Sequence, residues 1–331
     1  MLRSERSITA YLALFAAIAV AVCGQSPHIA QADHGGSVGK SDGVGKNAGT
    51  AGMANSVTLD FPKKTSLGKL WSCSKDWHAL GDCPDRFGGE TKLYTLIGDA
   101  KGQLTLPRNA ILRYKPSPEV MANVDLAKAM PREMIQFLDL SGMEFDKTAA
   151  DIFVYFPYAR RIDLGNAELD DELFSRMQFP QTVESINLDE IAMVGTTLKN
   201  LAKLRRLKNL ELAKAYLQPA GFEQLASIES LTRLDISKTR VTNDQLAFII
   251  SKLPKLEMLG LKTCTKLTPA CVKAIVSSPN LWMVDVVDTA ITPKMIADAQ
   301  NPHHKIKMII GGVSDREFTV REAEKIFHPL K

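Results

Sequence analysis

Residues 231–276 read LTRLDISKTRVTNDQLAFIISKLPKLEMLGLKTCTKLTPACVKAIV, and one apolar triplet occurs in this stretch twice. On both sides of this stretch the pattern continues, and the chain contains seven such triplets in all. They are Leu138-Asp139-Leu140, Ile162-Asp163-Leu164, Ile186-Asn187-Leu188, Leu210-Glu211-Leu212, Leu234-Asp235-Ile236, Leu259-Gly260-Leu261 and Val284-Asp285-Val286. Successive first residues are 24, 24, 24, 24, 25 and 25 positions apart. A fixed period of this length indicates a repeat architecture in which each unit packs on its neighbours.

Each repeat is expected to contain a strand, a turn and a helix. The two outer members of a triplet point into the core and the middle member points outward, as strand alternation requires. The apolar spacing then becomes helical, as at Leu246, Ile249 and Ile250. Threonine–proline pairs at 268–269 and 292–293 are typical helix starts. The sequence therefore predicts a right-handed α/β horseshoe arc of about seven repeats.

These motifs carry a family resemblance. Leu256-x-x-Leu259-x-Leu261-x-x-Cys264 resembles the cysteine-containing class of leucine-rich repeats, and the turns at 239–242 and 289–292 resemble the T-x-V/I-T turn of exported bacterial repeat proteins. The resemblance covers about half the chain and implies protein binding in general terms. The position that carries an asparagine ladder in many such proteins holds Met143, Ala167, Ile191, Ala215, Thr239, Cys264 and Thr289. We therefore expect hydroxyls, other backbone groups or water to satisfy the backbone in that turn.

The N-terminus has the pattern of a secretory signal peptide. Arg3 and Arg6 precede an uncharged apolar run from 8 to 22, and Ala30-Gln31-Ala32 follows. The run is shorter than the roughly 20 residues that span a bilayer. Residues 1–32 thus predict an exported protein, periplasmic or extracellular, cleaved after Ala32. An envelope lipoprotein acylated at Cys23 is the alternative, although Val22 departs from the small residue that a lipobox requires, and an uncleaved signal anchor is a third reading.

The rest of the chain divides by composition. Residues 33–56 are expected to be a flexible Gly/Ser-rich linker. Residues 57–116 form a small β-rich cap with strands near 57–61, 67–73, 93–97, 103–106 and 110–114. A capping segment at 117–133, repeats at 134–300 and a C-terminal cap at 301–331, whose last strand lies near 306–310, complete the predicted order. The caps cover the apolar ends of the solenoid.

The middle residues of the triplets form an outward column on the concave face: Asp139, Asp163, Asn187, Glu211, Asp235, Gly260 and Asp285. Neighbouring parallel strands lie about 4.8 Å apart, so these carboxylates repel one another, and a basic protein segment would relieve that repulsion. Solvated carboxylates with no partner are the alternative. The preceding residues form a second column: Phe137, Arg161, Ser185, Asn209, Arg233, Met258 and Met283. Phe137, Met258 and Met283 are expected to be exposed apolar contacts, and Arg161 and Arg233 either contact a partner or pair with the acidic column.

The cysteines have different predicted roles in an exported chain. Cys73 and Cys83 are expected to form a disulfide; a metal site that includes His78 lacks a fourth ligand and a zinc-like spacing. Cys264 and Cys271 are expected to be packed free thiols, with a local bridge as the alternative. The sequence predicts no metal and no cofactor.

Charge and motifs limit the function. A net charge of +4 does not favour nucleic acid, and the basic residues between 199 and 208 lack interleaved aromatics, so that stretch is read as a solvated convex face or a contact to anionic polymer or lipid. Membrane contact is expected only through a signal anchor or lipidated Cys23. No catalytic motif is present in the sequence. We expect a monomeric, non-enzymatic protein that binds a protein or peptide on its concave face, with a structural or lipid-anchored envelope component as the alternative.

Overall fold

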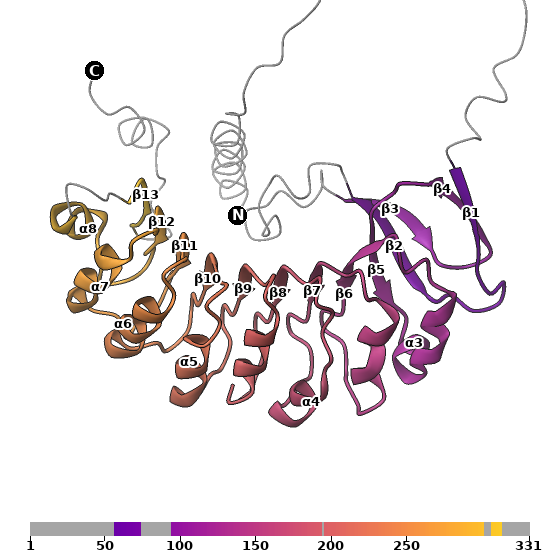
Figure 1. Ribbon diagram of the computed structural model, residues 1–331, viewed down its shortest axis with the longest axis horizontal. Helices are drawn as coiled ribbons and strands as arrows, with labels where there is room; N and C mark the ends of the chain where they lie inside the picture. The colour runs from indigo at the N-terminus through magenta and orange to yellow at the C-terminus, as the bar shows by residue number, and fades with distance from the viewer. Residues whose placement is uncertain (1–55, 74–93, 194, 301–305, 313–331) are drawn as a thin grey trace, which may run out of the picture.

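The computed structural model describes residues 56–73, 94–193, 195–300 and 306–312. Short strands line the inner, concave side of an arc, and helices line its outer, convex side (Figure 1). The main sheet has 11 strands, and the strands of the repeats follow one another in chain order. This architecture confirms the predicted α/β solenoid. The predicted signal peptide, Cys23 and nearly all of the linker lie outside the described residues.

Parallel strands run through the repeats at the predicted places. The strands are β6 (Ile135–Asp139), β7 (Arg161–Asp163), β8 (Ser185–Asn187), β9 (Asn209–Glu211), β10 (Arg233–Asp235), β11 (Met258–Gly260), β12 (Met283–Asp285) and β13 (Met308–Ile310). Equivalent residues pair across neighbouring strands, as Leu210 and Leu234 do. The outer members of the triplets are almost fully buried, from Leu138 to Val286. Burial of these apolar side chains between strands and helices is the main source of stability.

The convex side carries short α-helices and 3-10 helices. The elements are α3 (Pro118–Ala122), η2 (Val124–Ala129), η3 (Ala149–Tyr155), α4 (Asp171–Arg176), η4 (Leu198–Lys203), α5 (Pro219–Leu225), α6 (Asn243–Lys252), η5 (Pro269–Cys271), α7 (Val272–Ser277) and α8 (Pro293–Ala299). The side chains of Thr268 and Thr292 accept hydrogen bonds from Ala270 and Met295, so both predicted helix starts are confirmed. Within the described residues, no helix reaches the length and apolarity that crossing a bilayer requires.

The described N-terminal strands are β1 (Ser56–Asp60), β2 (Gly68–Cys73), β3 (Tyr94–Asp99), β4 (Gln103–Pro107) and β5 (Leu112–Pro116). Three of these five N-terminal strands, β2, β3 and β5, belong to the same sheet as the repeats. Strand β5 pairs in parallel with β6, and β2 pairs antiparallel with β5 and β3. Strands β1 and β4 form a separate two-stranded ribbon. The β-rich segment therefore extends the solenoid sheet at its first repeat, although its boundaries as a domain stay a prediction.

Each repeat turns through a left-handed residue just after its strand. These residues are Gly142, Asn166, Glu190, Lys214, Lys238, Thr263 and Asp288, with φ between 54° and 66°. Their N–H groups donate to a carbonyl of the next repeat, as Asn166 does to Asp189 at 2.7 Å. In the ladder position, the hydroxyls of Thr239 and Thr289 donate to the carbonyls of Ile236 and Val286. Hydroxyls thus satisfy part of this turn, as expected.

Candidate binding surface on the concave face

Each repeat strand directs two side chains toward the concave side, the middle residue of the triplet and the residue before the triplet. The strands align equivalent positions, so that Phe137 lies opposite Arg161 and Asp139 opposite Asp163. The last pairing adds Met308 beside Met283. The residues predicted for the two columns are therefore brought onto one surface by strand register.

The middle column is less solvated than expected. Asp139, Asp163 and Glu211 are 1%, 7% and 2% exposed. The side chains of five members accept a hydrogen bond from the backbone N–H two residues later: Asp139 from Ser141 at 3.1 Å, Asp163 from Gly165 at 2.9 Å, Asn187 from Asp189 at 2.8 Å, Asp235 from Ser237 at 2.7 Å and Asp285 from Val287 at 3.0 Å. This bond turns the chain at the end of a three-residue strand. The column of acids and amides thus has a structural role that the electrostatic reasoning from sequence missed.

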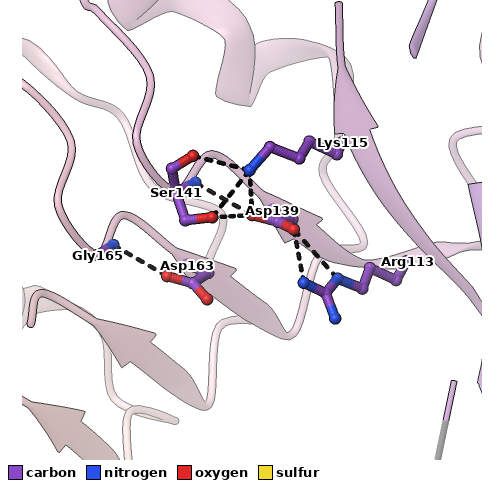
Figure 2. Close-up of polar contacts among 6 residues, drawn as sticks. All are labelled: Arg113, Lys115, Asp139, Ser141, Asp163 and Gly165. Carbon is purple, nitrogen blue, oxygen red and sulfur yellow. Dashed lines mark hydrogen bonds and ion pairs between the residues drawn. The ribbon is translucent and has the colours of Figure 1, made fainter. Parts of the chain in front are cut away.

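Asp139 is neutralised by strand β5. Arg113 donates from Nη2 and Nε to Oδ2 of Asp139 at 2.7 and 3.1 Å, and the Nζ of Lys115 lies 3.7 Å from Oδ1 (Figure 2). The Ser141 hydroxyl donates to Oδ1 at 2.7 Å. Burial alone would raise the pKa of Asp139, but Arg113, Ser141 and Lys115 together lower it. This carboxylate therefore offers little to a basic partner.

An aromatic–arginine cluster covers the N-terminal end of the face. It consists of Trp71, Tyr94, Arg113, Phe137 and Arg161. The Arg113 guanidinium lies 4.9 Å from the ring centroid of Phe137. It also lies 5.2 Å from the ring centroid of Trp71 and 5.1 Å from that of Tyr94. The prediction of an exposed Phe137 was wrong, because Trp71 and Tyr94 from the N-terminal strands pack against it and its exposure is 0%. Arg161 is also buried and lies 4.8 Å over Phe137.

The signal for this cluster was present in the sequence but was not used. Arg113 lies in the strand predicted near 110–114 and Lys115 directly follows it, two residues later, so continued alternation would place both on one face. Trp71 lies in the strand predicted near 67–73, within the segment read as a cap. Only the pairing of β5 with β6 brings these residues beside Asp139, and strand pairing over that distance is not encoded in local spacing.

Burial raises the pKa of each of the three thiols in the described ranges, so none of these three is an activated nucleophile. Burial raises the pKa of Cys73 to about 12, although Arg113 and Arg161 oppose the shift, so the thiol is protonated at neutral pH. Cys83 and His78 lie outside the described residues, and the predicted disulfide stays a prediction. Cys264 and Cys271 are buried free thiols, as preferred from the sequence. Burial also raises the pKa of Cys271, to about 11.

The centre of the face is polar. The Asn209 side chain donates to the Ser185 hydroxyl at 3.0 Å and to Glu211 at 2.9 Å. Burial raises the pKa of Asp163 to about 7; the Gly165 N–H opposes the rise, and the charge of Asp139 adds to it. The hydrogen bonds of these polar side chains are made within the protein. We call this central part of the concave face the polar floor.

A methionine cluster forms the C-terminal end of the face. It consists of Met258, Met283, Met308 and Ile310 with Trp282 and Val287, and it is separate from the main core. Met258, Trp282 and Val287 are half-buried. The prediction of an exposed Met283 was wrong, because Met308 and Trp282 pack with it and its exposure is 4%. Met258 and Met283 were predicted for this column, whereas Met308, 25 residues after Met283, was predicted only as part of the last strand. Gly260 leaves room for a neighbour, since a Cβ there would lie 2.5 Å from the Cγ of Asp235.

A groove of about 1070 Å³ lies between the N-terminal strands and the first repeat. Its lining includes apolar side chains and two cations: Trp71, Met121, Met143, Phe145, Lys69 and Lys115. The walls of this groove come from segments far apart in the sequence, so local spacing does not predict it. In the described part of the chain, no three His, Cys, Asp or Glu side chains gather as a metal site requires.

An arc of parallel three-residue strands backed by short helices is the architecture of leucine-rich repeat proteins. No protein-family model matches the chain, and no curated protein does. Similar solved structures include an internalin from Listeria monocytogenes (13% identity, TM-score 0.40, 56% of each chain covered) and the leucine-rich repeat protein LegL7 from Legionella pneumophila (16%, 0.39, 65% of this chain and 88% of the other). TLR13, solved in a complex with ssRNA13, is another (18%, 0.36, 49% and 28%). The chain thus spans little more than half of the internalin.

Proposed function

We propose that this protein binds a protein segment on its concave face and catalyses no reaction. The methionine cluster carries the proposal, because it is an apolar surface outside the main core with three half-buried members. Apolar patches of this kind mark interaction sites, and methionine and tryptophan are enriched in them. The partner is expected to place apolar side chains on the cluster and polar groups along the polar floor beside it.

The basic partner expected from sequence has support only toward the C-terminal half. Asp139 is held by Arg113 and Lys115, whereas Asp235 and Asp285 are half-buried close to the methionine cluster. A positive group in the partner would therefore sit near these two residues. We expect apolar contact with the methionine cluster, rather than charge, to contribute most of the binding free energy.

Site-specific photocrosslinking in the native host tests the proposal. A photoreactive residue at position 258 or 282 should crosslink to a discrete protein. The same residue at Phe248, which is 43% exposed on α6 of the convex side, is the control. Crosslinks from the convex position alone would refute a concave binding site. The Met258→Lys variant should lose the crosslink formed from position 282.

Export is part of the proposal and rests on residues 1–32. Cell fractionation followed by N-terminal sequencing separates the readings. A mature chain beginning at Asp33 supports cleavage and secretion, and an acylated N-terminal Cys23 supports an envelope lipoprotein. A full-length chain in the cytosol would contradict both. The envelope-component alternative would gain if concave crosslinks to other proteins were absent.

A further inference from the structure

The loops that connect each triplet to the next helix form one lateral flank of the arc. These loops lie side by side: Glu144 and Glu168 form a parallel bridge, and the Tyr216 N–H donates to the Ile191 carbonyl at 2.8 Å. We call the loops of the first six repeats the loop flank: residues 141–148, 165–170, 189–193, 195–197, 213–218, 237–242 and 262–268. The loop of the seventh repeat, 287–292, carries Asp288 and lies beyond this set. Alternate side chains of the loop flank point to solvent.

Charge on the loop flank is segregated along the arc. The first three loops carry one lysine and six carboxylates: Glu144, Asp146, Glu168, Asp170, Asp189 and Glu190. The next three loops carry no carboxylate and five cations: Lys214, Lys238, Arg240, Lys262 and Lys266. The one lysine in the acidic half, Lys147, lies 3.7 Å from Glu172 of α4. The flank is therefore acidic in one half and basic in the other.

This segregation places like charges beside one another within a single chain. Glu144 and Glu168 occupy paired positions, and like charges directly across neighbouring strands destabilise a sheet. At the boundary between the two halves, Lys214 pairs with Glu190. The opposite edge of the arc differs, because Arg160 there pairs with Glu184 of the next repeat at 2.6 Å. A partner with the reverse charge order would relieve the repulsion on the loop flank.

We propose that the loop flank is the interface of a symmetric homodimer. A two-fold axis that bisects the arc between β8 and β9 stacks two copies flank to flank in opposite directions. The third loop of one copy then faces the fourth of the other, the second faces the fifth, and the first faces the sixth. Every acidic loop meets a basic loop, as a self-complementary two-fold interface requires. Both concave faces stay open on the same side.

The side chains beside the axis fit this arrangement. Tyr216, in the fourth loop, is 56% exposed, and the equivalent position of the third loop holds Ala192, which is also exposed. The two-fold axis brings each Tyr216 ring over Ala192 of the second copy, where a small residue leaves room for an aromatic anchor. Charge governs orientation and association rate more than affinity, so we expect a weak dimer that dissociates as salt increases. The sequence-based expectation was a monomer.

Sedimentation velocity of the full exported chain tests the dimer. An all-basic variant (Glu144→Lys, Glu168→Lys, Glu190→Lys) and an all-acidic variant (Lys214→Glu, Lys238→Glu, Arg240→Glu) should each be monomeric. An equimolar mixture of the two should form a heterodimer, because each half then meets its opposite. The wild-type Kd should rise about tenfold or more between about 0.05 and 0.5 M sodium chloride. A triple variant on the basic convex stretch (Lys199→Glu, Lys203→Glu, Arg206→Glu) is the charge-matched control and should still dimerise.

Several results would overturn the proposal. One is a wild-type chain that stays monomeric at roughly 100 μM and low salt. Another is a mixture of the two variants that does not associate, with circular dichroism showing both folded. A wild-type dimer that Met258→Lys dissolves and the flank variants do not would place the interface on the concave face. Concave binding of another protein is tested separately by crosslinking, so either idea can fail alone.

Discussion

The two ends of the concave face use the same strand positions in opposite ways. At the N-terminal end, Phe137 and Asp139 are covered by strands β2, β3 and β5, and Arg113 binds both of them. At the C-terminal end, Met283 occupies the column that holds Phe137 but is only 4% exposed, because it packs with Met308 and Trp282, whereas Met258 in the same column is half-buried. A repeat position is therefore structural where neighbouring strands supply covering side chains. Met258 keeps part of its side chain open to a partner.

This difference changes what an acidic column means. Asp139 has two cations within reach, whereas Asp163, one strand further, is buried with a pKa of about 7. Identical residues in adjacent repeats thus have pKa values shifted in opposite directions. Periodicity alone treats them as equivalent.

The largest expected effect on stability comes from removing the Arg113–Asp139 ion pair at the N-terminal end of the concave face. Arg113→Met leaves the buried carboxylate of Asp139 without its main cation and should lower the free energy of unfolding by about 3–5 kcal/mol in urea titrations. The pKa of Asp139 is lowered in the folded state, so its ion pair stabilises above the unfolded value of about 3.9 and is lost as pH falls through the folded value. The difference between wild type and variant should therefore shrink in acid.

Arg160→Met is the matched control. Arg160 pairs with Glu184 at 2.6 Å, but the two side chains are 32% and 21% exposed. An ion pair of this kind contributes about 1 kcal/mol or less. Equal losses from the two variants would show that burial of the Arg113 pair has no special weight.

The second effect concerns Asp163. Its pKa rises to about 7 in the folded state, above the unfolded value of about 3.9, so the folded chain holds this proton more tightly and stability falls as pH rises between these two values. Asp163→Asn should therefore stabilise by about 2 kcal/mol near pH 8, and the gain should fade as pH drops from about 7 toward 4. Asn187 makes the same turn bond in the next repeat, so asparagine fits there. A gain that is constant with pH would indicate packing instead of charge.

Much of the fold could be predicted because each repeat is specified locally. The outer members of the triplets gave every repeat strand, and Thr268 and Thr292 gave two helix starts. The left-handed turn residues were not found, since Glu190, Lys214, Lys238 and Thr263 are not residues that favour φ above zero. Their conformation is imposed by hydrogen bonds between repeats.

The candidate site was less predictable, because it depends on contacts between distant segments. Met258 and Met283 could be placed on the concave face from alternation alone. Phe137 follows the same rule, but its covering layer comes from Trp71 and Tyr94 in strands that pair only after folding. Burial of an outward residue is a property of what lies above it, and sequence spacing does not contain that.

The third effect concerns the break in the column. Gly260→Ala would place a Cβ 2.5 Å from the Cγ of Asp235, which its own bond to Ser237 holds in place. We expect a loss of about 1–2 kcal/mol in the free energy of unfolding from this overpacking. In an Asp235→Ala background the same change should cost almost nothing, so a double-mutant cycle measures the coupling. Additive losses would mean that Gly260 is required for another reason.

The smallest effect compares the turns at the two ends. Gly142 and Thr263 occupy the same left-handed position, with φ of 66° and 58°. A β-branched residue is strained in this region, whereas glycine is not, although glycine loses more backbone entropy on folding. Thr263→Gly should therefore stabilise by about 0.5 kcal/mol, and Gly142→Thr should destabilise by about 1 kcal/mol, in urea titrations. Thr265→Gly, at an exposed position without positive φ, should lose stability. If both threonine changes lowered stability alike, the left-handed turn at Thr263 would hold no strain, and the two ends would differ only in what covers their concave side chains.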